Sequence, residues 1–412
     1  MANFQYEGAT DGFSDNQFKF IDGVLEKRGY TNKKVLIEAV GAAGDNYMAN
    51  VKRIIVEDAQ NKPFKMIAKV APKFEKLRAV FNTHSVFYNE HVIYTELIPQ
   101  FKMMQEAANL SNEDMIRFAE CYGSYIEEPD ELLLLEDLKE LNCVMLDRLK
   151  PLPEHCMHSV LRNLAIFHSL SFVLKHKNPE FFDTYRQKLF DLWANMGTNE
   201  EVKHNLVRIE EYILNLLSDS EDRSKVIKGI ITKIGDNLRE LVEEETGSEH
   251  TVIRHGDAWT NNFMFRFDGD TLLETIMIDY QMSSETKPTC DLLFFIFNCT
   301  DHQTRLKHFH KWIELYHTAL DRALSKFGLD AKNVYPKEKL DADLKRYGKP
   351  MCALCTFFSY LLTMNSEEAA KLKENLDNMN DVETEMVIEK SGVEFKSKVE
   401  GLIDTCLEFG LI

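Results

Sequence analysis

The sequence has few cysteines, few prolines and no long apolar run. Its 8 cysteines are scattered over 412 residues, which favours the reducing cytosol over a disulfide-bonded scaffold. The longest apolar candidate, Leu292 to Phe297, is far shorter than the roughly 20 residues that span a bilayer, and we interpret it as a buried segment. The first residues, MANFQYEGATDGF, have neither the basic start nor the apolar core of a signal peptide. We therefore expect a cytoplasmic protein without a membrane partner.

Positive charge is also scarce. Lysine and arginine together number 49 against 67 acidic residues, and the formal net charge is −18. The basic residues are dispersed among acids, so the surface would repel a phosphate backbone and no nucleic-acid partner is expected. Hydrophobic residues make up 44% and aromatic residues 11% of the chain, as in a globular protein. The length exceeds that of a single core and indicates two lobes.

The N-terminal part of the sequence alternates strand-like runs with turns. Lys34 to Val40, Tyr47 to Val56 and Phe64 to Ala71 are short runs rich in apolar residues, and their spacing predicts an antiparallel meander. Apolar residues then recur at helical spacing from Val86 to Leu97, and we expect Pro99 to end this helix.

Helical periodicity dominates after a short apolar strand at Leu132 to Leu135. It is present from Ser159 to Leu174 and again from Leu306 to Leu320. One stretch rich in strand signals, Thr251 to Gln281, lies between these helices.

The change of character near Glu136 to Lys139 is where we place the boundary between the lobes. Residues 1–138 would form an N-terminal lobe with a small antiparallel sheet and a main helix. Residues 139–412 would form a mostly helical C-terminal lobe that contains the catalytic hairpin and the substrate-binding region. The predicted class is α+β, with the two lobes of a protein-kinase-like fold.

The segment His255 to Asn262, with the sequence HGDAWTNN, carries the chemistry. Asp257 precedes Asn262 by five positions, and a second aspartate, Asp279, follows in Ile278-Asp279-Tyr280-Gln281. Phosphoryl transfer from ATP needs a carboxylate that accepts or orients the acceptor hydroxyl, and further oxygen ligands that hold Mg²⁺. Asp257 suits the first task, and Asn262 with Asp279 suits the second.

A hairpin between these residues would bring the two metal ligands together. Two strand-like runs, from Phe263 to Phe267 and from Leu272 to Ile278, flank Asp268-Gly269-Asp270, and Asp-Gly is a strong hairpin signal. Asn262 and Asp279 would then meet at the base of the hairpin. The alternative is a chance turn with Asp279 on the surface, but the full combination is much rarer than a three-residue match.

At this point the sequence resembles the ecdysteroid kinase-like family, a group within the aminoglycoside phosphotransferase and choline kinase superfamily. The resemblance covers nearly the whole chain. The segments that carry it are His255-Gly256-Asp257 with Trp259 and Asn262, Ile278 to Gln281, Asp291 to Phe295, Gly44 to Tyr47, Ala68 to Pro72, Phe87 to Glu90, Leu133 to Leu138, Val144 to Leu149, and Leu164 to Ser169. Phe294 stands where the family pattern leads us to expect tyrosine.

The resemblance implies roles for two N-terminal residues. Lys69 would be the strand lysine that contacts the nucleotide phosphates, and Glu90 on the following helix would be its ion-pair partner. Strand spacing alone does not choose between Lys65 and Lys69, because both lie on one face. Without the resemblance, a solvated lysine at the edge of a sheet would be the simpler reading.

The resemblance also implies where the nucleotide binds. The turn from Gly41 to Tyr47, with Gly44, Asn46 and Tyr47, would cover the phosphates, since a slim backbone can approach them closely. The Glu136 carbonyl and the Leu138 amide would pair with adenine. The expected cofactors are thus ATP and Mg²⁺.

Other chemically suggestive residues favour structural roles. His168 lies on the helix from Leu164 to Leu170 and is expected to be packed and hydrogen-bonded. Cys352 and Cys355 have the spacing of a redox or zinc pair, but they lie in an apolar helical stretch without a second pair and are expected to be buried thiols.

The expected partner is a small-molecule alcohol, and no protein partner is inferred. The family resemblance favours a steroid or another bulky apolar alcohol as acceptor. Two alternatives stay open: a choline- or aminoglycoside-type kinase acting on a cation or a detoxifying kinase of xenobiotics, and a catalytically silent nucleotide-binding module. Intact Lys69, Asp257, Asn262 and Asp279 argue against the silent module.

Overall fold

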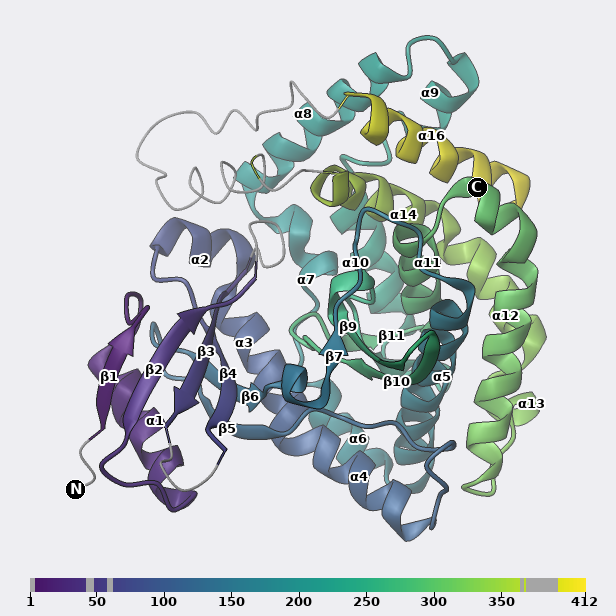
Figure 1. Ribbon diagram of the computed structural model, residues 1–412. Helices are drawn as coiled ribbons and strands as arrows, with labels where there is room; N and C mark the ends of the chain where they lie inside the picture. The colour runs from purple at the N-terminus through teal and green to yellow at the C-terminus, as the bar shows by residue number, and fades with distance from the viewer. Residues whose placement is uncertain (1–3, 42–47, 58–61, 364–366, 368–391) are drawn as a thin grey trace.

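The computed structural model describes residues 4–41, 48–57, 62–363, 367 and 392–412. A large sheet forms the N-terminal side of the molecule, and a mainly helical body forms the C-terminal side (Figure 1). This arrangement confirms the predicted two-lobed α+β class. The strands of the large sheet are β1 (Gln5–Gly8), β2 (Lys34–Ala39), β3 (Asn50–Val56), β4 (Phe64–Val70), β5 (Cys121–Tyr125) and β6 (Leu132–Glu136).

The order of strands in this sheet is β1-β2-β3-β4-β6-β5. The pairs β2/β3 and β3/β4 are antiparallel, so the predicted meander is confirmed, although its middle strand begins at Asn50 and not at Tyr47. β1 pairs with β2 in parallel, which the sequence analysis did not predict. Helix α1 (Asp15–Lys27) makes the crossover between them, and its N-terminus is closed by a capping box of Ser14 and Gln17.

Strand β4 shows how the sheet separates core from site. Met66, Ala68 and Val70 are buried in the core that the sheet forms with α1. Because successive side chains point to opposite faces of a strand, Lys69 projects from the other face, toward helix α3 (Thr83–Val92).

The expectation that Pro99 ends the helix is wrong. The helical run continues from α3 through a π-helical turn, Ile93–Leu97, into α4 (Ile98–Ala107). Pro99 lies in the first turn of α4. The wider π turn changes the hydrogen-bonding register just before this position, and a proline is tolerated in the first turn because its missing N–H costs least there. The short helix α2 (Glu75–Phe81) precedes α3.

The C-terminal lobe is built from helices around two small sheets. The sheets have the orders β10-β9-β7 and β11-β8. Their strands are β7 (Cys143–Val144), β8 (Val252–Arg254), β9 (Phe263–Asp268), β10 (Thr271–Met277) and β11 (Ser284–Thr286). The helices are α5 (Glu154–Lys177), α6 (Pro179–Arg186), α7 (Leu192–Asn195), α8 (Glu200–Leu216), α9 (Glu221–Ile227), α10 (Ile234–Glu245), α11 (Pro288–Cys299), α12 (His302–Ser325), α13 (Ala331–Val334), α14 (Lys337–Thr363) and α16 (Gly392–Glu408). Three short 3₁₀ turns in the described residues are η2 (Leu138–Leu141), η3 (Met196–Thr198) and η4 (Thr260–Asn262).

Helix α11 lies at the centre of this lobe. Every residue from Pro288 to Cys299 is buried, which confirms that Leu292 to Phe297 is a core segment. It packs against α14 and α5, and α12 packs along α5. Within the described residues, no helix combines the length and the apolar character needed to cross a membrane.

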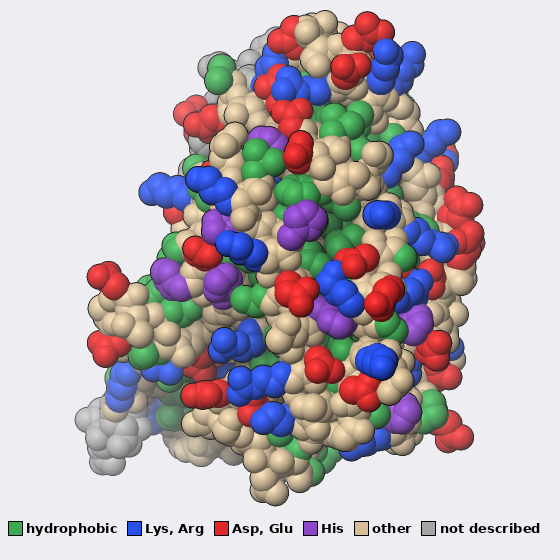
Figure 2. All heavy atoms as spheres, turned by 90° about the vertical axis from the view of Figure 1, so that its right-hand side faces the viewer, with side chains coloured by type: hydrophobic (Ala, Val, Ile, Leu, Met, Phe, Trp, Pro, Cys, Tyr) green, Lys and Arg blue, Asp and Glu red, His purple; other side chains and the backbone are tan. Residues whose placement is uncertain are grey.

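Charge is mixed on the face that Figure 2 shows, which is the right-hand side of Figure 1, where α12 and α13 lie. Acidic and basic side chains are interspersed there, together with several histidines. Such a face has no broad basic area of the kind that holds a nucleic-acid backbone.

Candidate active site

The loop that carries Asp257 begins where the buried strand β8 ends and closes with the 3₁₀ turn η4. The Asn262 side-chain amide donates to the Asp257 backbone carbonyl and to Asp257 Oδ2, both at 2.8 Å. These bonds hold the aspartate and the asparagine five positions apart as one unit. Asp257 Oδ1 is buried and has no hydrogen-bond partner among the described residues.

The hairpin of β9 and β10 returns the chain to the same place. Its strands pair in antiparallel fashion from Phe263↔Met277 to Asp268↔Thr271. At the base of the hairpin, beyond the Phe263↔Met277 pair, the Ile278 amide donates to the Asn262 carbonyl at 3.0 Å. Asp279 follows directly, so Asn262 and Asp279 do lie at the base of one hairpin.

Asp279 has a left-handed backbone conformation, with φ of 65°. A residue other than glycine in this region costs of order 1 kcal/mol, although aspartate and asparagine tolerate it better than most. In this conformation the Asp279 carboxylate lies within hydrogen-bond distance of Lys69.

Lys69 joins the two lobes. Its ammonium group donates to Glu90 Oε2 at 2.6 Å and to Asp279 Oδ1 at 2.7 Å. Lys65, the other candidate on this strand face, pairs with Glu140 at 2.8 Å instead. The geometry therefore selects Lys69 as the lysine that faces the site.

Burial and charge shift the pKa values of this cluster. Burial, with the nearby Asp279 carboxylate, raises the pKa of Asp257 to about 7. Burial also raises the pKa of Glu90, and Lys69 opposes that effect. Burial alone would lower the pKa of Lys69, but the carboxylates of Asp279 and Glu90 outweigh it, so its pKa is raised and the ammonium form is favoured.

A buried carboxylate holds the Asp257 loop from behind. Asp291, on α11, accepts the backbone amide of His255 at 2.7 Å and that of Gly256 at 2.9 Å. His168 lies at 3.1 Å from the same carboxylate through Nε2, and its Nδ1 lies 2.8 Å from the Tyr316 hydroxyl. His168 is thus packed and hydrogen-bonded, as predicted. The sequence signal for Asp291 was a single acid in an otherwise apolar helix.

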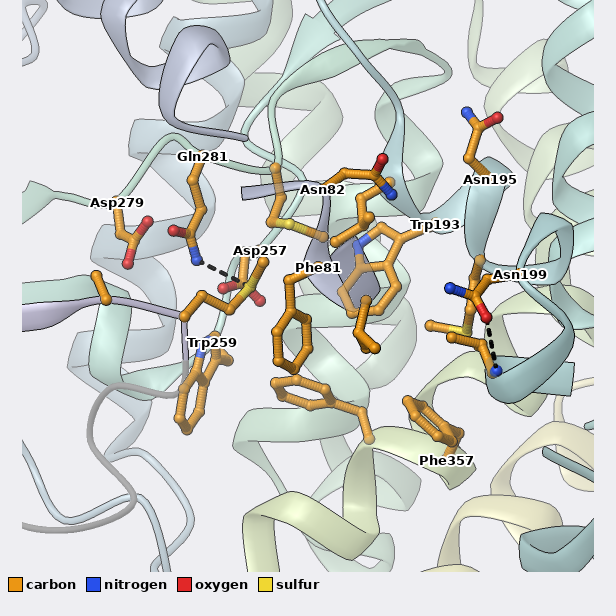
Figure 3. A pocket seen from close by; sticks show the side chains of 18 of the residues that line it. Phe81, Asn82, Trp193, Asn195, Asn199, Asp257, Trp259, Asp279, Gln281 and Phe357 are labelled. Atoms are coloured by element: carbon orange, nitrogen blue, oxygen red, sulfur yellow. Dashed lines mark hydrogen bonds between the residues drawn. The ribbon is translucent and has the colours of Figure 1, made fainter. Parts of the chain in front are cut away.

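A cavity of about 220 Å³ opens in front of these groups, between α2, α7, α8 and α14. Figure 3 shows Asp279 and Asp257 at one end, and Asn195, Asn199 and Phe357 at the other. Among the described residues that line it, the charged ones are Lys69, Asp257 and Asp279. The apolar part of the wall consists of Met48, Ala49, Val80, Phe81, Leu192, Trp193, Met196, Val202, Leu206, Trp259, Met282, Phe357 and Phe358.

Lys69, Glu90, Asp257, Asn262 and Asp279 all lie in the part of the sequence that matches a known protein family. The sequence profile of the ecdysteroid kinase-like family matches residues 43–329, more than half of the chain. The protein belongs to the ecdysteroid kinase-like family. The match includes the Asp257 loop, the hairpin and Lys69, and it confirms the resemblance seen in the sequence.

Several solved kinases resemble this family member weakly. A Plasmodium vivax ethanolamine kinase has a TM-score of 0.40 and 13% identity, over 83% of this chain and 80% of its own. A choline kinase from Streptococcus pneumoniae has a TM-score of 0.40 and 12% identity, and the match covers 95% of this chain and 100% of the choline kinase. An amicoumacin kinase in complex with AMP-PNP, Ca²⁺ and Ami has a TM-score of 0.41 and 12% identity, and the match covers 88% of this chain and 93% of the amicoumacin kinase. Scores this low indicate nothing about what the family member binds. No curated protein sequence matches the chain.

The structure describes only some of the residues that we expect to contact the nucleotide. Gly44, Asn46 and Tyr47 lie outside the described residues. Glu136 ends β6, and its carboxylate binds Arg117 at 2.5 Å, while the buried Leu138 begins η2. Neither residue is in the wall of the cavity, so their role at the adenine stays a prediction.

Two residues that the sequence analysis did not select also shape the site of this ecdysteroid kinase-like protein. Trp193 on α7 donates from Nε1 to the Gly256 carbonyl at 3.0 Å and lines the cavity. Gln281 follows Asp279 and lines the same cavity. By contrast, Cys352 and Cys355 are buried free thiols in α14, as expected.

Gly256 leaves no room for a side chain in the loop. Its φ is +85°, and an added Cβ would overlap the Met282 carbonyl oxygen. Gly269, at the hairpin tip, also has a positive φ, of +56°, but nothing lies within 4 Å of a Cβ there. The two glycines share the conformational requirement and differ in the space around them.

We predict that Gly256→Ala destabilises the protein much more than Gly269→Ala. The control should cost about 1 kcal/mol, because only the left-handed conformation is penalised. The loop variant should lose at least about 3 kcal/mol, or displace Asp257 enough to abolish activity, because the backbone must move. Urea unfolding of both variants measures the difference, and equal losses would contradict the proposed loop geometry.

Proposed function

We propose that this protein is an ATP- and Mg²⁺-dependent kinase that phosphorylates a hydroxyl group of a bulky apolar alcohol, an ecdysteroid or a compound of similar shape. One observation carries the proposal. Lys69, bound to Glu90 and Asp279, stands with Asp257 at one end of an otherwise mainly apolar cavity. Phosphoryl transfer needs positive charge, metal ligands and a carboxylate near the acceptor, all within one site.

The donor set fits a magnesium ion. Asp279 offers a carboxylate and Asn262 a side-chain amide oxygen, which are hard ligands of the kind Mg²⁺ prefers, and both line the cavity. When bound, the ion would neutralise charge on the nucleotide phosphates. Lys69 would contact the same phosphates, and Glu90 would fix the position of Lys69.

Asp257 is suited to act on the acceptor. Its Oδ2 is held by Asn262, whereas Oδ1 has no partner among the described residues. An acceptor hydroxyl in the cavity would donate its hydrogen bond to Oδ1, which orients the hydroxyl oxygen toward the terminal phosphate and receives its proton. The alcohol oxygen then forms a bond to phosphorus as the bond to ADP breaks.

The cavity wall favours a neutral apolar acceptor. Within the described part of the chain, its charged residues are the three assigned to nucleotide, metal and acceptor hydroxyl, and its other polar side chains are amides. Burying flat apolar surface against such a wall contributes about 25 cal/mol per Å². A cationic acceptor is the second candidate, because aromatic rings such as Trp193, Trp259 and Phe358 line the cavity and can face an ammonium group.

Our first prediction from this function concerns the metal. ATP should raise the melting temperature only when Mg²⁺ is present, because ligand binding stabilises the native state by mass action, by about 2.7 kcal/mol at a hundred times Kd. Asp279→Asn should remove the metal-dependent part, since asparagine tolerates the positive φ but lacks the charge. Asp270→Asn, at the exposed hairpin tip, is the matched control. Stabilisation that persists in a chelator would contradict the metal site.

A second prediction separates binding from chemistry. Asp257→Asn should keep ATP affinity within a few-fold and lower kcat by about 10²–10⁴, because the residue acts on the acceptor hydroxyl. Lys69→Ala should weaken ATP binding and turnover together. Calorimetry and steady-state assays measure both quantities. Near-normal turnover in Asp257→Asn would refute the assignment and favour a silent nucleotide-binding module.

A third prediction concerns the acceptor class. We expect kcat/KM for ecdysteroids to exceed that for choline, ethanolamine and aminoglycosides by at least about tenfold, because the described lining residues offer a cation no carboxylate beyond those already assigned. A coupled assay of ADP release across the panel measures the ratio. A preference for any of the cations would overturn the acceptor and leave the kinase assignment in place.

A further inference from the structure

Gln281 has a side-chain amide in the cavity that is only weakly bonded within the described residues. In Figure 3 its side chain lies near Asp257 and Asp279 and points into the cavity. Gln281 is only 5% exposed, yet its Oε1 has no hydrogen-bond partner among the described residues. Its Nε2 donates to the sulfur of Met48 at 3.4 Å, and a thioether is a weak acceptor.

A hydrogen bond that does not involve this amide group holds the backbone at Gln281. Asn89 donates from Nδ2 to the Gln281 carbonyl at 3.0 Å. An unsatisfied buried amide oxygen costs about 1–3 kcal/mol. A leucine of similar size would avoid that cost, so the glutamine is better explained by something that enters the cavity and pairs with it.

We propose that Gln281 binds a second hydroxyl of the acceptor, next to the hydroxyl that Asp257 orients, and that the acceptor is therefore a diol. This inference rests on the proposed kinase function. A hydroxyl can donate to Oε1 and accept from Nε2 at once, whereas an ammonium group only donates and a carboxylate only accepts. Gln281 and Asp257 line the same cavity and lie near each other in Figure 3, so we place the second hydroxyl close to the one that Asp257 orients.

Two other uses of the amide are distinguishable from this one. Oε1 is also a hard ligand that could hold the metal with Asp279, and Nε2 could donate to a phosphate. Either use would make Gln281 part of nucleotide binding. A diol contact instead makes the residue select between acceptors, without changing the metal-dependent affinity for ATP.

The experiment compares acceptors that differ by one hydroxyl. Two pairs serve: 20-hydroxyecdysone with ecdysone, and ecdysone with 2-deoxyecdysone. NMR of the product locates the phosphate, and the informative pair is the one whose differing hydroxyl neighbours it. The variant is Gln281→Leu, and the matched control is Asn205→Leu, which replaces an amide in the part of the wall formed by α8.

We expect the wild-type protein to prefer the diol of the informative pair by about 10- to 100-fold in kcat/KM, because the mono-alcohol leaves the buried amide unpaired. In Gln281→Leu this ratio should fall to about 1, and in Asn205→Leu it should persist. The stabilisation of Gln281→Leu by MgATP should equal that of the wild type, which also shows that the variant is folded.

Four outcomes would overturn the inference. Two concern the wild type: equal kcat/KM for diol and mono-alcohol, and phosphate on a hydroxyl that has no neighbouring hydroxyl. Two concern Gln281→Leu: an unchanged ratio of kcat/KM between diol and mono-alcohol, and loss of MgATP stabilisation although the variant is folded. If Gln281→Leu does not fold, Gln281→Glu gives the second test, because a carboxylate accepts but does not donate and should lower the diol preference. No steroid phosphorylation at all, with MgATP binding intact, refutes the acceptor class itself.

Discussion

The site depends on one ammonium group held between two carboxylates. Lys69 comes from the N-terminal sheet, Glu90 from helix α3 and Asp279 from the end of the β9–β10 hairpin. Removing one partner of such a buried pair leaves an uncompensated charge and costs about 3–5 kcal/mol. Packed apolar residues would serve stability as well, so the charges are better explained by what the site binds. The Lys69–Asp279 contact also joins β4 of the N-terminal sheet to the end of the β9–β10 hairpin.

The Asp257 loop is held by hydrogen bonds on two sides. On the cavity side, Asn262 holds the Asp257 carboxylate. On the far side, Asp291 accepts two consecutive backbone amides of the loop and is itself bound to His168. Burial alone would raise the pKa of Asp291, but the hydrogen bond and charge of His168, with the charges of His255 and Arg254, outweigh it, so its pKa is lowered and the ionised form is favoured. The buried Asp291 carboxylate thus positions the loop that carries Asp257, the carboxylate to which we assign the catalytic role.

What the sequence predicts well is what depends on near neighbours in the chain. The Asp-Gly turn and its flanking strands predict the hairpin, and the hairpin alone brings Asn262 to Asp279. Pro99 misled the helix prediction, because a π turn before it was not visible in the residue pattern. The residues around Lys65 and Lys69 do not show which lysine faces the site. That depends on a contact with Asp279, which is 210 positions away from Lys69.

The residues that the sequence analysis missed are those whose meaning comes from distant contacts. Trp193 reaches the Gly256 carbonyl across 63 positions, and Asn89 reaches the Gln281 carbonyl across 192. Gln281 stands beside a conspicuous aspartate in the sequence, but only the structure shows its amide oxygen without a partner. No periodicity or motif reports whether a polar side chain is satisfied, because that depends on the packing of the whole cavity wall.

The central claim is that Asp257 directs the terminal phosphate of ATP onto an alcohol oxygen bound in this cavity. The most direct measurement is a single-turnover transfer of labelled γ-phosphate from MgATP to 20-hydroxyecdysone, with the wild-type protein and Asp257→Asn compared at equal nucleotide occupancy. We expect labelled steroid phosphate from the wild type and transfer slowed by about 10²–10⁴ in the variant. Equal transfer by both proteins, or label released only as inorganic phosphate by the wild type, would contradict the account.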